Sequence, residues 1–295
     1  MQPDEELNEL CKKIELGKDF LSPSRITEEL KKMILHSTRP SLGFRWVEKI
    51  GRLKELFPEL EATIGVLQIE RYHPEGDVFE HTMQAVDAAA GLQNDNPEEI
   101  FFYSDEEKLK VILGTLCHDF GKVFTTDENK HAYGHEKVIE PAKHFLHRFE
   151  FGKQINKSVI LFIKFHHRLH QVLESHNPEL RTKKLAHELW PKANIKELVM
   201  VCLSDLRGRS SEGDSLPLTC PIPGVDKFIE IAKRLDVWTK PEPALISGKD
   251  LKGYVEPGPE MGEMLERAYE IQITQNIKDK KKLIELTVAG SIQSH

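Results

Sequence analysis

Apolar residues recur at spacings of three and four along most of this chain. Such spacing places them on one face of a helix and predicts amphipathic helices. Residues 5–16 show it with Leu7, Leu10, Cys11 and Ile14. The sequence therefore predicts an all-α protein. Helices are expected over residues 5–16, 25–36, 41–50, 109–122, 135–149, 156–173, 185–190, 195–206 and 226–235, and others near Asp77 and from Glu260.

The segment LKVILGTLCHDFGK, residues 109–122, has apolar positions too dense for a surface helix. We interpret it as a central helix, buried on most sides, that Gly121 closes. Its end carries His118 and Asp119 side by side, and buried polar groups are costly unless they have partners. For an isolated pair, ordinary hydrogen bonds within the core would be the better explanation. A metal ion becomes the better partner when further ligands join the pair.

Three further candidate ligands occupy comparable places in other expected helices. His81 lies on the apolar face of the helix that Asp77 is expected to cap. His135 follows a glycine where its helix begins, and Asp205 ends an apolar run much as Asp119 ends the central one. Each histidine alone is more typical of a satisfied core residue. Their accumulation in one helical segment favours a shared site.

Histidines are concentrated in the middle of the chain. All but two of the 14 lie within residues 73–187, which make up about two-fifths of the sequence. His166 and His170 share one face of the helix expected over 156–173, because residues at i and i+4 are neighbours on a helix surface. The spacing leaves open whether His166 or His167 is the inward ligand.

Composition and charge narrow the class of protein. Hydrophobic residues make up 39% and charged residues 30% of the 295 residues, as in ordinary globular proteins. No apolar run approaches the roughly 18 residues of a membrane span, and the acidic N-terminus lacks a signal-peptide pattern. The cysteines, which lack CxxC spacing, suggest reduced thiols and a cytoplasmic protein. They are Cys11, Cys117, Cys202 and Cys220. The net charge of -7 argues against a general attraction to nucleic acid but leaves a local basic face open.

Imidazole and carboxylate ligands without thiolate suit a divalent Mn, Fe, Co, Ni or Mg ion better than a structural zinc. We expect one or two ions per chain. With fewer protein ligands than coordination positions, such a site leaves room for a water that the metal converts into a hydroxide nucleophile. The expected ligands are His81, His118, Asp119 and Asp205 for the first ion and His135 and His166 for the second, with Asp119 bridging.

Basic side chains near these ligands are candidates for substrate binding. Lys122, one turn after His118, can reach a phosphate oxygen as a point charge. An exposed lysine near a helix C-terminus is an equally good interpretation. We assign Asp119, Lys122 and Arg209 to catalysis, and Lys122, His170 and Arg209 to substrate binding.

The candidate ligands resemble the signature of the HD-domain metal-dependent phosphohydrolases, which is a histidine, a later HD doublet and a distant aspartate. The chain is still more similar to the C-terminal half of the bacterial CCA-adding tRNA nucleotidyltransferases, which carry such a domain. The strings that carry this resemblance, in family order, are RPSLGFRWVEKIGRLKELFPEL, GVLQIERYHPEGDVFEHT, LCHDFGK, GHE, FHHRLH, ISGKDL and PGPEMGEMLERAYE.

This resemblance implies a helical HD bundle flanked by further helices. The expected segments are a helical neck or collar at residues 1–70, an HD domain at 71–238 and a helical tail at 239–295. It also implies hydrolysis of phosphate esters of nucleotides or RNA ends, as a 2',3'-cyclic phosphodiesterase, 2'-nucleotidase or phosphatase. Nickel is a typical activator in that family, and contact with tRNA is a further implication.

The sequence departs from those enzymes before residue 70, where it has neither a glycine-rich nucleotide loop nor a D-x-D carboxylate pair. We therefore expect no CCA-adding activity. The alternative function is that of a module that binds tRNA or other RNA, or serves in assembly, and whose metal site is vestigial. The acidic net charge argues against this alternative. A (p)ppGpp or deoxynucleotide triphosphohydrolase shares the metal signature but lacks the neck and tail strings. The physiological substrate, the native metal and the oligomeric state stay open.

Overall fold

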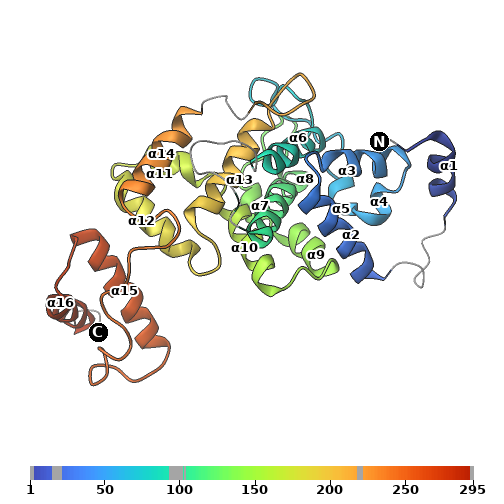
Figure 1. Ribbon diagram of the computed structural model, residues 1–295. Helices are drawn as coiled ribbons and strands as arrows, with labels where there is room; N and C mark the ends of the chain where they lie inside the picture. Colours follow the sequence, from blue (N-terminus) through green and yellow to red (C-terminus); the bar gives the residue numbers. More distant parts are fainter. Residues whose placement is uncertain (1–2, 15–21, 93–101, 103, 218–221, 293–295) are drawn as a thin grey trace. The chain divides into compact units, whose positions relative to one another are not determined.

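The computed structural model describes residues 3–14, 22–92, 102, 104–217 and 222–292 (Figure 1). Within these ranges the chain is helical, with an isolated bridge between Leu67 and Asp77, and the all-α prediction is confirmed. The chain forms two compact units, which are described separately. Unit 1 comprises Met1–His170 and Lys196–Asp226, and unit 2 comprises Gln171–Ile195 and Lys227–His295. The expected division into segments 1–70, 71–238 and 239–295 stays a prediction.

Unit 1 contains the helices on which the candidate ligands lie. They are α1 (Glu5–Lys13), α2 (Pro23–His36), α3 (Ser41–Lys49), α4 (Leu53–Leu56), α5 (Pro58–Glu61), α6 (Val78–Gly91), α7 (Asp105–Cys117), α8 (Lys122–Thr125), the 3-10 helix η1 (His135–Lys137), α9 (Glu140–Arg148), α10 (Lys153–Phe165) and, apart from its first residue, α13 (Ile195–Arg207). Two further helices, α11 (Arg168–Leu173) and α14 (Pro223–Arg234), have residues in both units.

Short polar side chains begin several of these helices. Asp4, Ser22, Asp77 and Ser104 each accept a hydrogen bond from the backbone amide three residues later. Such caps satisfy amide groups that have no partner within the first turn. The cap expected at Asp77 is confirmed, and it fixes where the helix that carries His81 begins.

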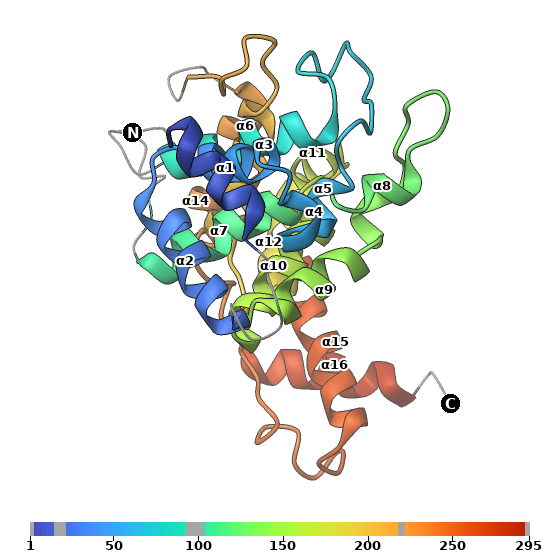
Figure 2. The same ribbon diagram turned by 90° about the vertical axis from the view of Figure 1, so that its right-hand side faces the viewer.

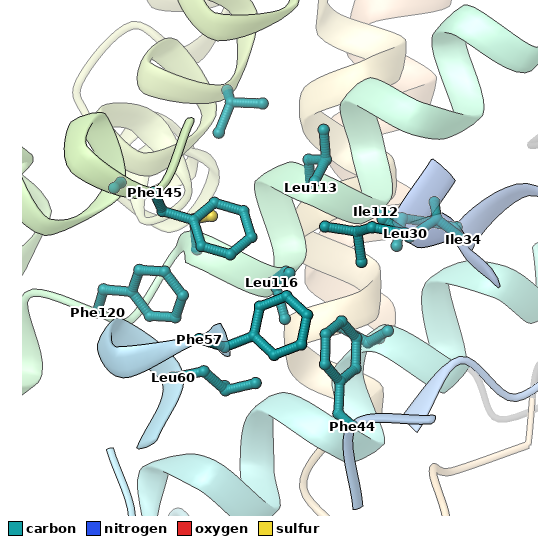
Figure 3. Packing of buried hydrophobic residues seen from close by; sticks show 14 of the residues in the cluster. Leu30, Ile34, Phe44, Phe57, Leu60, Ile112, Leu113, Leu116, Phe120 and Phe145 are labelled. Atoms are coloured by element: carbon teal, nitrogen blue, oxygen red, sulfur yellow. The ribbon is translucent and has the colours of Figure 1, made fainter. Parts of the chain in front are cut away.

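The core of unit 1 forms around α7, which packs against α6, α10 and α2 (Figure 2). Leu113 and Leu116 of α7 meet a group of aromatic rings that includes Phe57, Phe120 and Phe145 (Figure 3). The Phe120 and Phe145 rings meet edge to face with centroids 5.8 Å apart, which is a favourable aromatic arrangement. This packing holds the C-terminal end of α7 in the interior of unit 1.

One glycine lets α10 approach α7 closely. A Cβ atom at Gly114 would lie 2.7 Å from the ring of Phe162 in α10 and 3.3 Å from a methyl carbon of Val201 in α13. Three helices therefore meet where α7 has no side chain. This close approach involves α7, α10 and α13, each of which carries a candidate ligand or ends beside one.

Several helices differ from the expected boundaries. The central helix ends at Cys117, with a turn through His118 and Asp119, instead of continuing to Gly121. The helix expected over 156–173 is interrupted after Phe165, and α11 begins at Arg168. The helix expected over 135–149 is the short 3-10 turn η1 followed by α9. In the first two cases the break falls at a histidine, His118 or His166, whose ring bonds to the carbonyl oxygen of the residue three positions earlier.

Unit 2 contains α12 (Pro178–Leu189), α15 (Pro259–Gln275) and α16 (Lys280–Ile292). Its apolar core includes Leu251, Met264, Ala268 and Leu283. Within the described part of the chain, no helix is both long enough and apolar enough to cross a membrane. The thiols of Cys11, Cys117 and Cys202 are free, and Cys220 lies outside the described residues.

Candidate metal centre

Three histidines of unit 1 are held by the same local hydrogen bond. His118, His135 and His166 each place Nδ1 2.7 Å from the carbonyl oxygen of the residue three positions earlier. A carbonyl oxygen only accepts hydrogen bonds, so each Nδ1 carries the proton and each Nε2 carries a lone pair in the neutral ring. The backbone thereby fixes the ring tautomer that leaves Nε2 free to bind a metal.

His81, from the first turns of α6, faces His118 across the site. Its Nδ1 lies 2.7 Å from Oε1 of Glu75 and 3.2 Å from the carbonyl oxygen of Gly208. Its Nε2 lies 3.3 Å from Nε2 of His118 and 3.2 Å from Oδ1 of Asp205. Because Glu75 accepts from Nδ1, the Nε2 lone pair of His81 also points into the group of ligands.

A second group lies around His135. Its Nε2 is 3.2 Å from Nε2 of His166 and 3.1 Å from Nε2 of His167. His166 and His167 occupy the break between α10 and α11, which lets consecutive side chains reach the same place. Both rings therefore point inward, whereas the spacing allowed only one to do so.

Asp119 lies between the two groups. Its Oδ2 is 3.1 Å from Nε2 of His118, and its Oδ1 is 3.1 Å from Nε2 of His135. The side chain is almost fully buried, yet neither oxygen completes a well-aligned hydrogen bond within the described residues. Buried carboxylates without such bonds are costly. Asp119 is thus placed as a carboxylate that could contact a cation in each group.

The arrangement fits divalent cations better than it fits hydrogen bonding among the side chains alone. Burial opposes protonation, but Asp205 raises the pKa of His81 and Asp119 raises that of His135. In the neutral form in which imidazole binds metals, the facing Nε2 atoms at 3.3 and 3.2 Å carry lone pairs and cannot hydrogen-bond to one another. The structure brings together His81, His118 and Asp119 in one set of potential ligands, and His135, His166 and His167 in another. Asp205 adjoins the first set through His81. Mixed nitrogen and oxygen donors of this kind suit transition metal ions.

Two basic side chains flank the carboxylates. Lys122 Nζ lies 2.7 Å from Oδ2 of Asp119 and donates to Oε1 of Gln68, also at 2.7 Å. Arg209 Nη2 donates to Oδ1 of Asp205 at 2.8 Å. Lys122 is buried, which excludes the interpretation of an exposed lysine at a helix end. Both positive groups therefore contact the carboxylates of the site directly.

The charges of the site act on its carboxylates. Burial opposes ionisation, but His118 and Lys122 hold the pKa of Asp119 well below its usual value. Burial likewise opposes the ionisation of Asp205, and Arg209 and His81 hold its pKa well below the usual value. Both groups are therefore anionic near neutral pH, as metal ligands must be.

Burial also opposes the charged form of two histidines, and there it prevails. Desolvation, together with the neighbouring His167 and His118, holds the pKa of His166 well below its usual value. Desolvation lowers the pKa of His167 to about 4. Both rings are therefore neutral near pH 7, the form in which imidazole binds metals.

The six expected ligands all lie in this part of unit 1, but the substrate-binding assignment of His170 is less favoured. Its side chain is exposed in α11, and the break after Phe165 separates it from the face that carries His166. The role of His170 stays a prediction. The roles assigned to the expected ligands are likewise taken up below as proposals.

Sequence reasoning left His167 open as an alternative to His166, and it missed three other residues that lie beside the expected ligands. His73, Glu75 and Gln68 each contact a candidate ligand or its partner. Oε1 of Glu75 bridges Nδ1 of His73 and Nδ1 of His81, and these bonds hold the pKa of Glu75 at about 2 although burial opposes its ionisation. The string HPEGD at residues 73–77 offered a signal, since a carboxylate follows a histidine just before the helix that carries His81.

Comparisons with known protein families give two matches, one to the part of the chain that carries the candidate ligands and one to the N-terminal helices. Residues 78–206 match the HD domain family, and residues 4–64 match the family described as "Probable RNA and SrmB- binding site of polymerase A". The HD match spans α6 to α13 and contains His81, His118, Asp119 and Asp205. HD domains are a superfamily of metal-dependent hydrolases, and they typically bind divalent metals.

The curated relatives include several that are named "Multifunctional CCA protein". The Pasteurella multocida protein is 32% identical over 193 residues, which cover 64% of this chain and 44% of the relative. The Haemophilus influenzae protein is 30% identical over 221 residues, 74% of this chain and 50% of the relative. The Methylobacillus flagellatus protein is 29% identical over 222 residues, which also cover 74% of this chain and 50% of the relative. The chain thus spans about half the length of the curated relatives it matches. The chain therefore contains an HD domain at residues 78–206, and it is homologous to the C-terminal part of multifunctional CCA proteins.

Proposed function

We propose that this protein is a metal-dependent phosphohydrolase acting on phosphate esters of nucleotides or RNA ends, as a 2',3'-cyclic phosphodiesterase, 2'-nucleotidase or phosphatase. The observation that carries this proposal is the convergence of His81, His118, Asp119 and Asp205 around facing lone pairs. The match of residues 78–206 to the HD domain supports it independently.

The first group would hold one divalent cation through His81, His118, Asp119 and Asp205. The second group would hold another through His135 and His166, with Asp119 shared and His167 as an added ligand. Such a cation supplies Lewis-acid charge for a phosphoryl group and lowers the pKa of water. The protein contributes ring nitrogens already fixed in the metal-binding tautomer, which reduces the reorganisation needed on binding.

Lys122 and Arg209 would orient the phosphate. Lys122 is fixed between Asp119 and Gln68 at 2.7 Å from each. Arg209 is fixed by Asp205, and its Nε is buried without a hydrogen-bond partner in the described residues. An unpaired guanidinium donor is costly in a buried site and suits a phosphate oxygen. These contacts place positive charge on both sides of the carboxylates.

The test is hydrolysis of 2',3'-cyclic AMP and 2'-AMP with Mn or Ni, followed as opened ring or released phosphate. We expect activity in the wild type and its loss in Asp119→Asn, because the shared carboxylate loses its charge. Glu128→Gln is the matched control, since Glu128 is exposed on a loop in the same unit. Equal rates in wild type and Asp119→Asn would contradict the proposal.

A second candidate function is RNA binding through the N-terminal helices. The match of residues 4–64 to an RNA-binding segment favours it, and it is compatible with hydrolysis of RNA ends. A salt titration of tRNA binding measures it, because the slope counts the phosphate contacts that release counterions. If the protein binds stoichiometric metal and hydrolyses the esters but has no affinity for tRNA, the RNA-binding function is excluded and the hydrolase function stands. Incubation with tRNA, ATP and CTP tests the separate expectation that this chain adds no nucleotides.

A further inference from the structure

A polar pocket of about 390 Å³ lies beside Glu75, the carboxylate that accepts from Nδ1 of His81. Arg45, Glu75, Glu80 and Gln84 line it together with residues of the loop that follows α13, namely Ser210, Ser211 and Gly213. Its volume falls within the range of about 300–1,000 Å³ that is typical of small-molecule sites. Figures 1 and 2 show that the loop before α6 and the loop after α13 project from the same side of unit 1.

One wall of this pocket contains a buried acceptor with no partner. Glu75 has a fully buried side chain, and its Oε1 is occupied by His73 and His81. Its Oε2 has no hydrogen-bond partner within the described residues. A buried carboxylate oxygen without a donor is costly, so the pocket wall suits a ligand that brings a donor to Oε2.

The other walls of the pocket are rigid and polar. Arg45 and Glu80 form a two-pronged ion pair with both N to O distances at 2.7 Å. Gln84 donates to the carbonyl oxygen of Ser210 at 3.0 Å and accepts from its amide nitrogen at 3.2 Å. The loop is therefore fastened to α6, and the pocket does not depend on a ligand for its form.

The charge of the lining indicates which part of a substrate fits. The positive charge of Arg45 neutralises the negative charge of Glu80. The formal charge of the pocket lining is therefore -1, which comes from Glu75. An anionic phosphate is disfavoured there, whereas hydroxyl groups can donate to the free carboxylate oxygen. The lining side chains are polar, so they offer hydrogen bonds and not the flat apolar surface that a base would stack on.

The pocket is linked to the proposed phosphate site through adjacent residues. Arg209, which is paired with Asp205, directly precedes Ser210 of the pocket wall. Glu75 and His81 are in contact at 2.7 Å, so a single imidazole separates the pocket from the proposed metal. A phosphate held by Arg209 would therefore leave the attached sugar near Ser210 and Ser211.

We propose that this pocket binds the sugar hydroxyls of a nucleotide substrate, with Oε2 of Glu75 accepting from one of them. This inference rests on the proposed hydrolase function, which it deepens by assigning the sugar its own site. The phosphate contacts the metal-binding side and the sugar contacts the pocket. The protein thereby distinguishes nucleotides from phosphate esters that lack a sugar.

The test fills the pocket without altering Glu75 or any proposed ligand. Ser211 is exposed and lines the pocket, so Ser211→Phe places a ring in it, and Ser24→Phe makes the same change on an exposed serine of α2. We expect Ser211→Phe to raise KM for 2'-AMP, whose 3'- and 5'-hydroxyls are free, about tenfold, the effect of losing one hydrogen bond to a charged group. KM for p-nitrophenyl phosphate, which has no sugar, should not change in either variant.

Equal changes for the two substrates, or none for the nucleotide, would overturn the proposal. Binding of adenosine and of adenine to the wild-type protein, measured by calorimetry, tests the pocket if no ester is hydrolysed. Adenosine should bind and adenine should not, and Ser211→Phe should abolish the binding of adenosine. Absent adenosine binding would refute the sugar site, whereas adenosine binding without hydrolysis would refute the hydrolase function alone.

Discussion

The Nε2 atoms of His135 and His166 face one another at 3.2 Å while the Nδ1 atom of each ring is held by a backbone carbonyl. The two rings come from separate parts of the chain, η1 and the end of α10. In their neutral forms neither ring can donate through Nε2, an arrangement in which the two rings could hold a cation between them. The same relationship recurs between His81 and His118.

Replacing Glu75 by glutamine should weaken metal binding. Glu75 accepts from Nδ1 of His81, and carboxylates in this position orient a ligating imidazole and increase its basicity. We expect the dissociation constant for Mn to rise about 10-fold to 100-fold, as for other changes to groups that support metal ligands. Calorimetric titration measures it. Glu70→Gln, an exposed change in the same segment, is the control, and unchanged affinity in Glu75→Gln would show that His81 is oriented without it.

Adding a divalent metal should raise the unfolding temperature of unit 1. A ligand that binds only the folded state stabilises it by about 2.7 kcal/mol at a concentration of 100 times its dissociation constant. Thermal scans with and without Mn, at equal ionic strength, measure this increase. Chelator should reverse it. Asp119→Asn should show little increase, since the shared ligand is lost, and an equal increase in that variant would place the metal elsewhere.

Gly121→Ala should disturb the second group of ligands. A Cβ atom there would lie 2.3 Å from the carbonyl oxygen of His135 and 3.1 Å from that of Val138, so the backbone around η1 must shift. Overpacking of this kind costs about 1–3 kcal/mol of unfolding free energy. Denaturant unfolding and metal titration measure the two effects. Gly262→Ala in α15, where a Cβ meets no atom within 4 Å, should leave both unchanged or increase stability slightly.

Acid should weaken unit 2 through Glu242. Burial opposes ionisation of this carboxyl, but hydrogen bonds from Lys183, Lys278 and Gln272 lower its pKa to about 2 from the ordinary value of 4.5. A pKa depressed by folding stabilises the folded state fully above the unfolded-state pKa. This contribution is therefore present above about pH 4.5 and is lost as the pH falls toward 2.

Glu242→Gln tests this pH dependence. Urea unfolding can be followed by the fluorescence of Trp190 and Trp238, both in unit 2, in a Trp46→Phe background. We expect the variant to be less stable than the wild type at pH 7 and the difference to shrink below pH 4. Glu256→Gln, an exposed change in the same unit, should follow the wild type. A difference that stays constant with pH would exclude the ionised carboxylate as its source.

The sequence sufficed for the helical class, and it singled out side chains that lie together in unit 1, because both are local patterns; their role as ligands stays a prediction. Each candidate histidine or aspartate ended an apolar run or lay on an apolar face, as His118 and His81 show. The candidate ligands come together in space because the helices α6, α7, α10 and α13 pack against one another. That packing includes the close approach at Gly114, which periodicity does not reveal.

The helix ends were harder to predict for a physical reason. At His118 and His166 the ring bonds to the carbonyl oxygen three residues earlier, and the helix ends at that histidine. The apolar period continues past these points in the sequence, so it predicted longer helices. The break after Phe165 in turn brought His167 inward, which spacing along one uninterrupted helix did not allow.

The position of Asp119 has a consequence for titrations of this protein. One of its oxygens faces His118 and the other faces His135, so both halves of the centre draw on the same negative charge. The first ion to arrive would partly neutralise that charge before a second ion meets it. Filling of the two halves would then be anticooperative, with a tight step and a weaker one instead of two equal steps.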